Sequence, residues 1–543
     1  MSYGMLLFIA LLYIGITVYL GWLGYQHTKS SKDYMIAGGE VHPYLMAMGY
    51  GSTFISTSAI VGFGGAAAVY GMSLLWLTAF NIICGVFIAF VILGTRTRSM
   101  GAILNVQTFP EMLGVRFRSK FIRTFSAIVL TVSMPLYAAA VMIGGARFME
   151  QALQVNYTAA LLIVAFIVGA YVMAGGMKGV LYTSAFQGTL MLLAMFLLMV
   201  LTYVKLGGIT AAHQALTSLA DKVPASLVEQ GHMGWTAMPE TGSILWLYVI
   251  TTLVMGVGVG VLAQPQLAVR YLTVKSNKDL YRALAPGGVF ILMMTGVGFT
   301  VGALSNVFFN DKFGKISLLM AIDPATNAPN IDKIIPLFIT EAMPSWLGYL
   351  FLLTLLAAAM STLSGQIHAI ATSVSYDLFK SSRGDKGQLK LARYGTLFGF
   401  LVTLLISFIL PGNIIAIATA IFFGLCAASF LPMYVSGLFW KRATVPGVTW
   451  GMVVGTVVYV FDMLFMHTKE ATIFKVSQLI LGKDTIAGFP WNVIDPLVIA
   501  LPASIIVTLV VSLVTKPMEQ SHIDKCFGFQ SLRNQETTNT LNR

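Results

Sequence analysis

The chain has 543 residues, of which 57% are hydrophobic and only 10% are charged. Soluble domains carry about 25% charged residues, so this composition, with a mean hydropathy of +0.81, excludes a water-soluble globular protein. The formal net charge of +12 could suggest a nucleic-acid partner. The basic residues instead gather in alternate loops between apolar segments, which indicates membrane topology.

We count about 13 apolar segments that are long enough to cross a bilayer as helices. The first lacks a positively charged leader and a small-residue cleavage site, so we interpret it as a spanning helix and not as a signal peptide. The sequence therefore predicts an all-α polytopic membrane protein. Its expected spans are 4–25, 45–71, 74–95, 122–151, 157–176, 182–206, 243–263, 283–308, 346–378, 393–411, 413–438, 445–466 and 493–515.

Lysine and arginine follow an alternating pattern along the loops. Cytoplasmic loops are normally the basic ones. We therefore expect a multi-pass protein of the cell (cytoplasmic) membrane, with the N-terminus outside and the C-terminus in the cytoplasm. The basic loops are 96–123, 270–282, 380–393 and 441–442, and the long outer loops, with scattered lysines only, are 207–242, 309–345 and 467–492.

The second segment, 46–71, does not read as an ordinary spanning helix. Glycines crowd both of its flanks, and a hydroxyl-rich run, Ser52 to Ser58, lies between them. Such a segment is tolerated at membrane depth where other helices surround it or where it lines a site. Close packing of small residues is the alternative interpretation.

The seventh segment, 243–263, is also rich in glycine. Gly256, Gly258 and Gly260 alternate, and Pro265 follows. The second and seventh segments are five apart, so segments 2–6 and 7–11 would form two five-helix units of opposite orientation. Interrupted segments at matching positions of two halves indicate a transporter binding site.

A third polar patch lies in segment 346–378. Ala358, Ser361 and Thr362 are spaced i, i+3, i+4 and share one helix face. The Ala358 carbonyl and the two hydroxyls make a three-oxygen cluster, and hard cations prefer oxygen ligands. Two carbonyls from an unwound partner would complete a sodium site. The alternative is that both hydroxyls bond back to their own helix.

Six motifs together resemble the sodium:solute symporter family, which includes sodium–sugar, proline, sialic acid, pantothenate and monocarboxylate transporters. IGGARFMEQALQVNY (143–157) is similar to the pantothenate branch, and AQPQLAVRYLTV (263–274) is similar to both the pantothenate and the monocarboxylate branches, so the chain resembles these two branches most. The six motifs are SKDYMIAGGEV (31–41), STFIS (52–56), TFPEMLGVRFRS (108–119), GGMKGVLYTSAFQ (175–187), VRYLTVKSNKDLYRA (269–283) and LAAAMSTLSGQ (356–366).

The resemblance implies a five-plus-five inverted repeat of the LeuT type, with one extra helix before it and two after. The corresponding division is an N-terminal helix and loop (1–43), a first five-helix repeat (44–206), an outer loop (207–242), a second repeat (243–438), two C-terminal helices (439–515) and a cytoplasmic tail (516–543).

The resemblance also implies a sodium site between the second and ninth spanning helices. Its ligands would be the backbone carbonyls of Ser52, Ile55 and Ala358 and the hydroxyls of Ser361 and Thr362. Many relatives carry an acid, linked to a second sodium, where this chain has Ser184. We therefore expect one sodium per cycle.

We expect the solute to be a carboxylate, because an anion beside sodium would offset its charge in an interior with almost no acid. Phe54 stands where proline-transporting relatives have an acid, which argues against proline. A half-helix N-terminus could receive the carboxylate. The residues that we place around the solute are Thr57, Ser58, Ala59, Thr78, Asn81 and Gly256.

The prediction is thus a sodium-coupled symporter that imports a small carboxylate, such as a monocarboxylate or a pantothenate-like molecule, by alternating access. We expect no catalytic residue, no cofactor other than the coupling ion and no nucleic-acid partner. Two alternatives remain: a symporter of a neutral solute such as a sugar, coupled to sodium or, through His368, to protons; and a membrane sensor built on a transporter scaffold. Polar packing is the favoured interpretation of Gln366 and His368.

Overall fold

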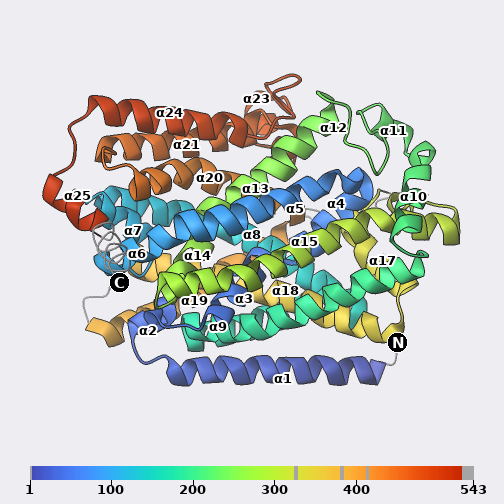
Figure 1. The fold of residues 1–543 in the computed structure, drawn as a ribbon, viewed down its shortest axis with the longest axis horizontal. Helices are drawn as coiled ribbons and strands as arrows, with labels where there is room; N and C mark the ends of the chain where they lie inside the picture. Colours follow the sequence, from blue (N-terminus) through green and yellow to red (C-terminus); the bar gives the residue numbers. More distant parts are fainter. Residues whose placement is uncertain (1–2, 154, 323–327, 380–383, 411–414, 529–543) are drawn as a thin grey trace, which may run out of the picture.

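The computed structural model describes residues 3–153, 155–322, 328–379, 384–410 and 415–528. Within these ranges the chain is helical, with no β-strand and a single isolated bridge between Ile322 and Pro329. Most of the long helices run roughly parallel or antiparallel (Figure 1). The all-α membrane architecture expected from composition is confirmed.

Eleven helices of the described residues are long and apolar enough to cross a membrane. Some of these helices contain short π-helical or 3-10 helical stretches. The eleven are α1 (Tyr3–His27), the run Ser58–Leu104, α8 (Lys120–Leu153), α9 (Tyr157–Lys205), the run Ile244–Ala263, α15 (Asn277–Phe313), α18 (Ser345–Thr372, continuing to Leu378), α19 (Gly384–Ile409), α20 (Ile415–Phe439), α21 (Val445–Phe465) and α24 (Leu497–Val514).

Two of the eleven runs are too long for one crossing. A straight helix of the length of α9, 49 residues, would extend roughly 70 Å, against about 30 Å of hydrocarbon. α9 turns at Gly176 (φ 52°), and the run Ser58–Leu104 turns at Gly71 (φ 73°). The expected segment boundaries at 71–74 and 176–182 fall at these turns, while the total of 13 crossings stays a prediction.

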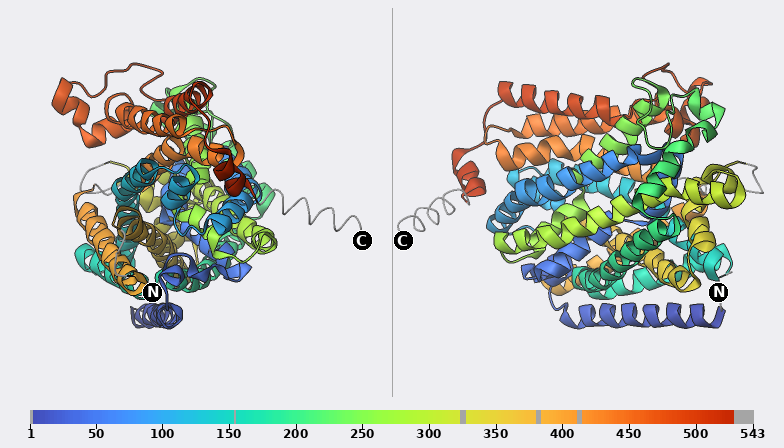
Figure 2. Two further views of the ribbon diagram at one scale, coloured as in Figure 1. Left: turned by 90° about the vertical axis from the view of Figure 1, so that its left-hand side faces the viewer. Right: turned by 45° about the vertical axis from the view of Figure 1, so that its right-hand side comes forward.

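α18 is at the centre of the bundle and packs against α8, α9, α19 and α3 (Pro43–Phe54). Its most apolar window is 83% buried, against 28% for α1 and for α24. Viewed along the bundle, α1 lies at one edge and the C-terminal helices lie at the opposite edge (Figure 2). The polar patch predicted on segment 346–378 therefore lies in the interior.

Short helices cover both ends of the bundle (Figure 1). One end carries α2 (Ser31–Ile36), α6 (Thr95–Leu104), α7 (Phe109–Arg116) and, from the tail, α25 (Gln520–Phe527). The other end carries α10 (Ile209–Ser218), α11 (Ala225–Val228) and α17 (Ile334–Ala342). The first end contains the basic loop 96–123, which we assign to the cytoplasm as a prediction.

The turn at Gly176 leads to a stability prediction. A Cβ atom at this position would lie 2.5 Å from the Tyr34 ring, and the positive φ is unfavourable for any side chain. We expect Gly176→Ala to destabilise the protein by about 1–3 kcal/mol, measured as a lower melting temperature of the purified protein in detergent.

Gly15→Ala is the matched control, because nothing lies within 4 Å of a Cβ at that position. It should not lower the melting temperature, since alanine favours the helix of α1 more than glycine does. Equal melting temperatures for Gly176→Ala and the parent protein would contradict the role of the turn.

Candidate functional site

The helix of the glycine-flanked segment is broken between Phe54 and Thr57. α3 ends at Phe54, and Ile55 takes an extended conformation (φ −90°, ψ 100°). The helix resumes with η2 (Ser58–Gly62) and α4 (Phe63–Tyr70). The Ser56 hydroxyl accepts a hydrogen bond from the Ser58 N–H at 3.1 Å, which caps the new start. Because α3 ends here, its last backbone carbonyls have no N–H donors from a following helical turn.

Two hydroxyls of α18 meet the end of α3 at this break. The Ser361 and Thr362 hydroxyls both donate to the Ser52 carbonyl, at 2.8 Å and 3.0 Å. The Ser361 hydroxyl also lies 3.3 Å from the Ala358 carbonyl. The Ser361 and Thr362 hydroxyls therefore bond to α3, and the alternative that they bond only within their own helix does not hold in this structure. The Ala358 and Ser52 carbonyls and the two hydroxyls form one buried oxygen cluster.

The structure brings together four of the five residues proposed as sodium ligands. Ser52, Ala358, Ser361 and Thr362 share the hydrogen bonds given above, and Ile55 is the residue directly after α3. All five are 1% exposed or less. Neutral hydroxyl and carbonyl oxygens of this kind suit a hard monovalent cation.

The break in the seventh segment lies later in the sequence than we predicted. Gly256 and Gly260 keep helical dihedral angles, and the chain leaves the helix at Gln264 (ψ 113°), directly before Pro265. A Cβ at Gly258 would lie 2.7 Å from Phe80, and one at Gly260 would lie 2.6 Å from Phe423. Close packing of helices therefore explains these two glycines, and the residue before proline explains the break.

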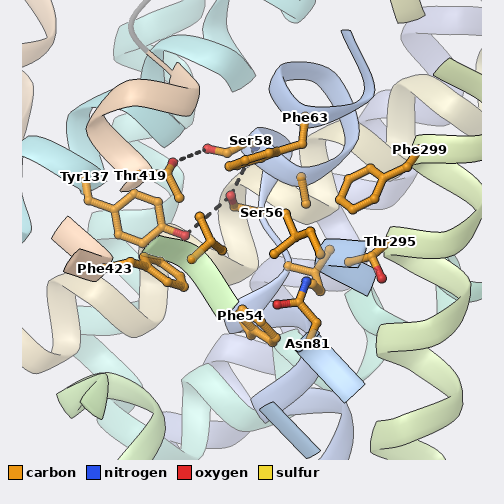
Figure 3. A pocket seen from close by; sticks show the side chains of 14 residues that line it. Phe54, Ser56, Ser58, Phe63, Asn81, Tyr137, Thr295, Phe299, Thr419 and Phe423 are labelled. Carbon is orange, nitrogen blue, oxygen red and sulfur yellow. Dashed lines mark hydrogen bonds between the residues drawn. The ribbon is translucent and has the colours of Figure 1, made fainter. Parts of the chain in front are cut away.

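A small cavity lies beside the break in α3 (Figure 3). Its volume is about 20 Å³, which is room for about one water molecule. A solute could enter only after the surrounding helices move apart. The cavity is lined by Phe54, Ile55, Ser56, Ser58, Ala59, Phe63, Leu77, Asn81, Tyr137, Val257, Thr295, Phe299, Thr419 and Phe423.

Three of the six residues that we placed around the solute line this cavity: Ser58, Ala59 and Asn81. The other three are buried nearby but face elsewhere. Thr57 Oγ1 lies 2.9 Å from a Cβ built at Gly144, and Asp495 Oδ2 lies 3.5 Å from one built at Gly256. Thr78 on α5 (Leu75–Ile82) does not line the cavity in this conformation.

Sequence reasoning missed the aromatic residues of the cavity. Tyr137 on α8 points its hydroxyl toward Ser56 Oγ, 3.5 Å away, and the Thr419 hydroxyl donates to Ser58 Oγ at 2.9 Å (Figure 3). Phe54, Phe299 and Phe423 complete the apolar part of the lining. No sequence signal separates these residues from ordinary apolar core residues, because they come from different helices.

His368 is a packing residue in this structure. Its Nε2 donates to the Tyr34 carbonyl at 2.8 Å, and its ring stacks on the Tyr34 ring with centroids 5.6 Å apart. Ser184 is next to the oxygen cluster, because its carbonyl accepts a hydrogen bond from the Ser52 hydroxyl at 3.3 Å. The Ser184 and Gln366 side chains are buried and have no partner among the described residues.

The loop 207–242 covers the far end of α4. Trp235 Nε1 donates to the Ala68 carbonyl and His232 Nε2 donates to the Val69 carbonyl, both at 2.8 Å. The Met72 N–H donates to the Trp235 carbonyl at 2.7 Å. The loop therefore forms hydrogen bonds with the last turn of α4, the half-helix that begins at the cavity. If α4 tilts, either the loop moves with α4 or these hydrogen bonds break.

Known proteins resemble the chain over nearly its full length. A sodium/proline symporter of Staphylococcus saprophyticus is 26% identical over 89% of this chain and 90% of its own. A sodium/pantothenate symporter of Haemophilus influenzae is 26% identical over 83% and 89%. Because the two identities are equal, they do not indicate which of the two solutes this chain would transport.

Solved structures show the same fold. A Na+-coupled sialic acid symporter in a substrate-bound outward-open state superposes with a TM-score of 0.71 at 18% identity, covering 95% of this chain and 99% of that one. These matches confirm the LeuT-type helical fold. The family model of the sodium:solute symporter family matches residues 34–455. The chain therefore belongs to the sodium:solute symporter family.

Proposed function

We propose that the protein is a sodium-coupled symporter that imports a small organic carboxylate across the cell membrane, with one sodium ion per cycle. The observation that carries the proposal is the convergence of the Ser361 and Thr362 hydroxyls on the Ser52 carbonyl at the broken end of α3. Sodium would bind there to Ser52, Ile55, Ala358, Ser361 and Thr362, with the hydroxyl hydrogens turned away from the ion.

The chemistry of the cavity supports a carboxylate without an amino group. The lining contains no Lys, Arg, Asp or Glu, so it offers no carboxylate to receive an ammonium group. The aromatic side chains suit an apolar body, and Asn81, Ser56 and Thr419 supply hydrogen bonds (Figure 3). The negative charge of the solute would be offset by sodium bound one turn away, so that each would favour binding of the other.

The surroundings of Ser184 support a single sodium. Where the family resemblance implies an acid in many relatives, this chain has the neutral residue Ser184, whose backbone carbonyl accepts a hydrogen bond from the Ser52 hydroxyl. A second cation there would lack a carboxylate to offset its charge in a low-dielectric interior.

The small volume of the cavity, about 20 Å³, supports alternating access, because a solute needs a wider site. In the proposed cycle, sodium binds from outside and holds α18 against α3, and the solute then binds at the break. The helices on the cytoplasmic side move apart, and the low cytoplasmic sodium concentration releases the ion and then the solute. Thr57, Thr78 and Gly256 would approach the solute only in another conformation of this cycle.

The coupling is tested with the purified chain in proteoliposomes. Uptake of radiolabelled monocarboxylates, pantothenate, proline and a sugar is measured with and without an inward sodium gradient, at several pH values. Carboxylate uptake that requires the gradient is the expected result. Equal uptake without it contradicts coupling to sodium, and uptake that follows the pH gradient instead indicates proton coupling.

Removal of both α18 hydroxyls should weaken the response to sodium. We expect Ser361→Ala with Thr362→Ala to raise the sodium concentration for half-maximal uptake at least about tenfold, because two ligands of a hard cation are lost. Ser364→Ala is the control, since the Ser364 hydroxyl donates to the carbonyl of Ser361 in its own helix at 2.9 Å. Unaltered sodium dependence of the double variant would show that the ion binds elsewhere.

Substitutions of Asn81 test the charge of the solute. Asn81→Ala should weaken solute affinity by about tenfold, the effect of one lost hydrogen bond in a buried site. Asn81→Asp should weaken a carboxylate much further, because it places a like charge in the cavity. Similar affinities for the two variants, measured by competition for uptake, would favour a neutral solute.

A further inference from the structure

Arg270 places a buried positive charge beside the oxygen cluster. It belongs to η8 (Val269–Thr273), which follows the break of the seventh segment, and it is fully buried. Its guanidinium lies between α3 and α18, against Gly49 and Gly365. Gly49 is in the half of α3 before the break, whereas the cavity lies after it. Arg270 is therefore on the opposite side of the oxygen cluster from the cavity.

Two glycines provide the space for the guanidinium. A Cβ at Gly49 would lie 2.6 Å from Nη1 of Arg270, and one at Gly365 would lie 3.2 Å from Nη2. Both helices thus lack a side chain where the guanidinium approaches them. The tight fit leaves the charge little freedom to move away from the cluster.

Thr53 connects the guanidinium to the cluster. Its hydroxyl accepts a hydrogen bond from Arg270 Nη2 and donates one, at 3.4 Å, to the carbonyl of Ser361. Ser361 in turn bonds the Ser52 carbonyl. The charge is thus linked through the Thr53 hydroxyl to the backbone of a proposed sodium ligand.

The charge of Arg270 is not neutralised by an acid. None of the ion pairs between described residues includes Arg270, and its Nε and Nη1 atoms have no partner. Arginine stays protonated in proteins, and an unpaired buried charge is costly. The C-terminal end of α3 is the nearby feature that favours a cation, and sodium would use the same end.

We propose that Arg270 is a fixed cation that weakens sodium binding at the Ser52–Ser361–Thr362 cluster and thereby speeds release of the ion. The inference rests on the proposed sodium site. Two like charges at the end of one short helix repel each other in a medium that screens poorly, so the bound ion is less stable than its oxygen ligands alone would make it. Tighter binding would slow the step in which sodium leaves.

The test is binding of radioactive sodium to the purified full chain, with solute uptake measured in parallel. Arg270→Gln should tighten sodium binding by about tenfold and lower the maximal rate of uptake. Arg270→Lys keeps the charge and should bind sodium with nearly the parent affinity. Damage to the fold would weaken sodium binding, so tightening cannot arise from misfolding. Unchanged or weaker binding by Arg270→Gln overturns the proposal.

A second pair of variants leaves Arg270 in place. Thr53→Asp supplies the missing counter-ion and should tighten sodium binding, whereas Thr53→Asn, its neutral match, should not. Equal sodium affinities of these two Thr53 variants would also overturn the proposal. The two variants keep the proposal testable if Arg270→Gln does not fold.

Two controls separate the possible failures. Arg116→Gln removes another buried arginine, which bonds the Gly437 and Trp440 carbonyls, and should leave sodium affinity unchanged. If the Ser361→Ala and Thr362→Ala double variant binds sodium normally, the proposed site itself is wrong. If that variant loses sodium but Arg270→Gln binds like the parent, only the role of Arg270 is wrong.

Discussion

The rest of the site depends on one contact between α3 and α18. In this contact, two hydroxyls of α18 donate hydrogen bonds to the backbone carbonyl of Ser52. It exists because α3 stops at Phe54 and leaves its last carbonyls without helical partners. In this conformation the hydroxyls of Ser361 and Thr362 satisfy that carbonyl. An ion that takes hydroxyl and carbonyl oxygens as ligands would bridge the same two helices more strongly, and so would bias the position of α18 relative to α3.

The electrostatics of the interior follow from how few charges it contains. The cavity beside the break is lined by neutral side chains only. The charges near the proposed site would be the ion, the solute, the dipole of α3, the guanidinium of Arg270 and the buried carboxyl group of Asp495 beside Gly256. In the proposed mechanism, an anionic solute and Arg270 would act in opposite directions on the same ion. In the proposed cycle the solute would stabilise the bound ion, and Arg270 would speed release of the ion, which comes before release of the solute.

The sequence contains the information for features that depend on local periodicity. Ser361 and Thr362 share a face with Ala358 because of their spacing, and α18 places them as predicted. The turns at Gly71 and Gly176 coincide with gaps between apolar segments. The break in the seventh segment was predicted at Gly256–Gly260 but lies at Gln264. Glycines that allow close packing against Phe80 and Phe423 look the same in sequence as glycines that interrupt a helix.

The aromatic lining of the cavity could not be predicted, because it depends on which helices become neighbours. Tyr137, Phe299 and Phe423 come from three helices that are distant in sequence. The isolation of Arg270 is likewise a tertiary property, since only packing shows that it forms no ion pair with an acid among the described residues.

The central claim, that sodium joins α3 to α18 at the helix break, is tested most directly by hydrogen–deuterium exchange of the purified chain in sodium and in potassium. The account predicts slower exchange in sodium, confined to peptides that cover 43–58 and 345–372, and no such change in the double variant Ser361→Ala with Thr362→Ala. Identical exchange of these peptides in the two salts would contradict it.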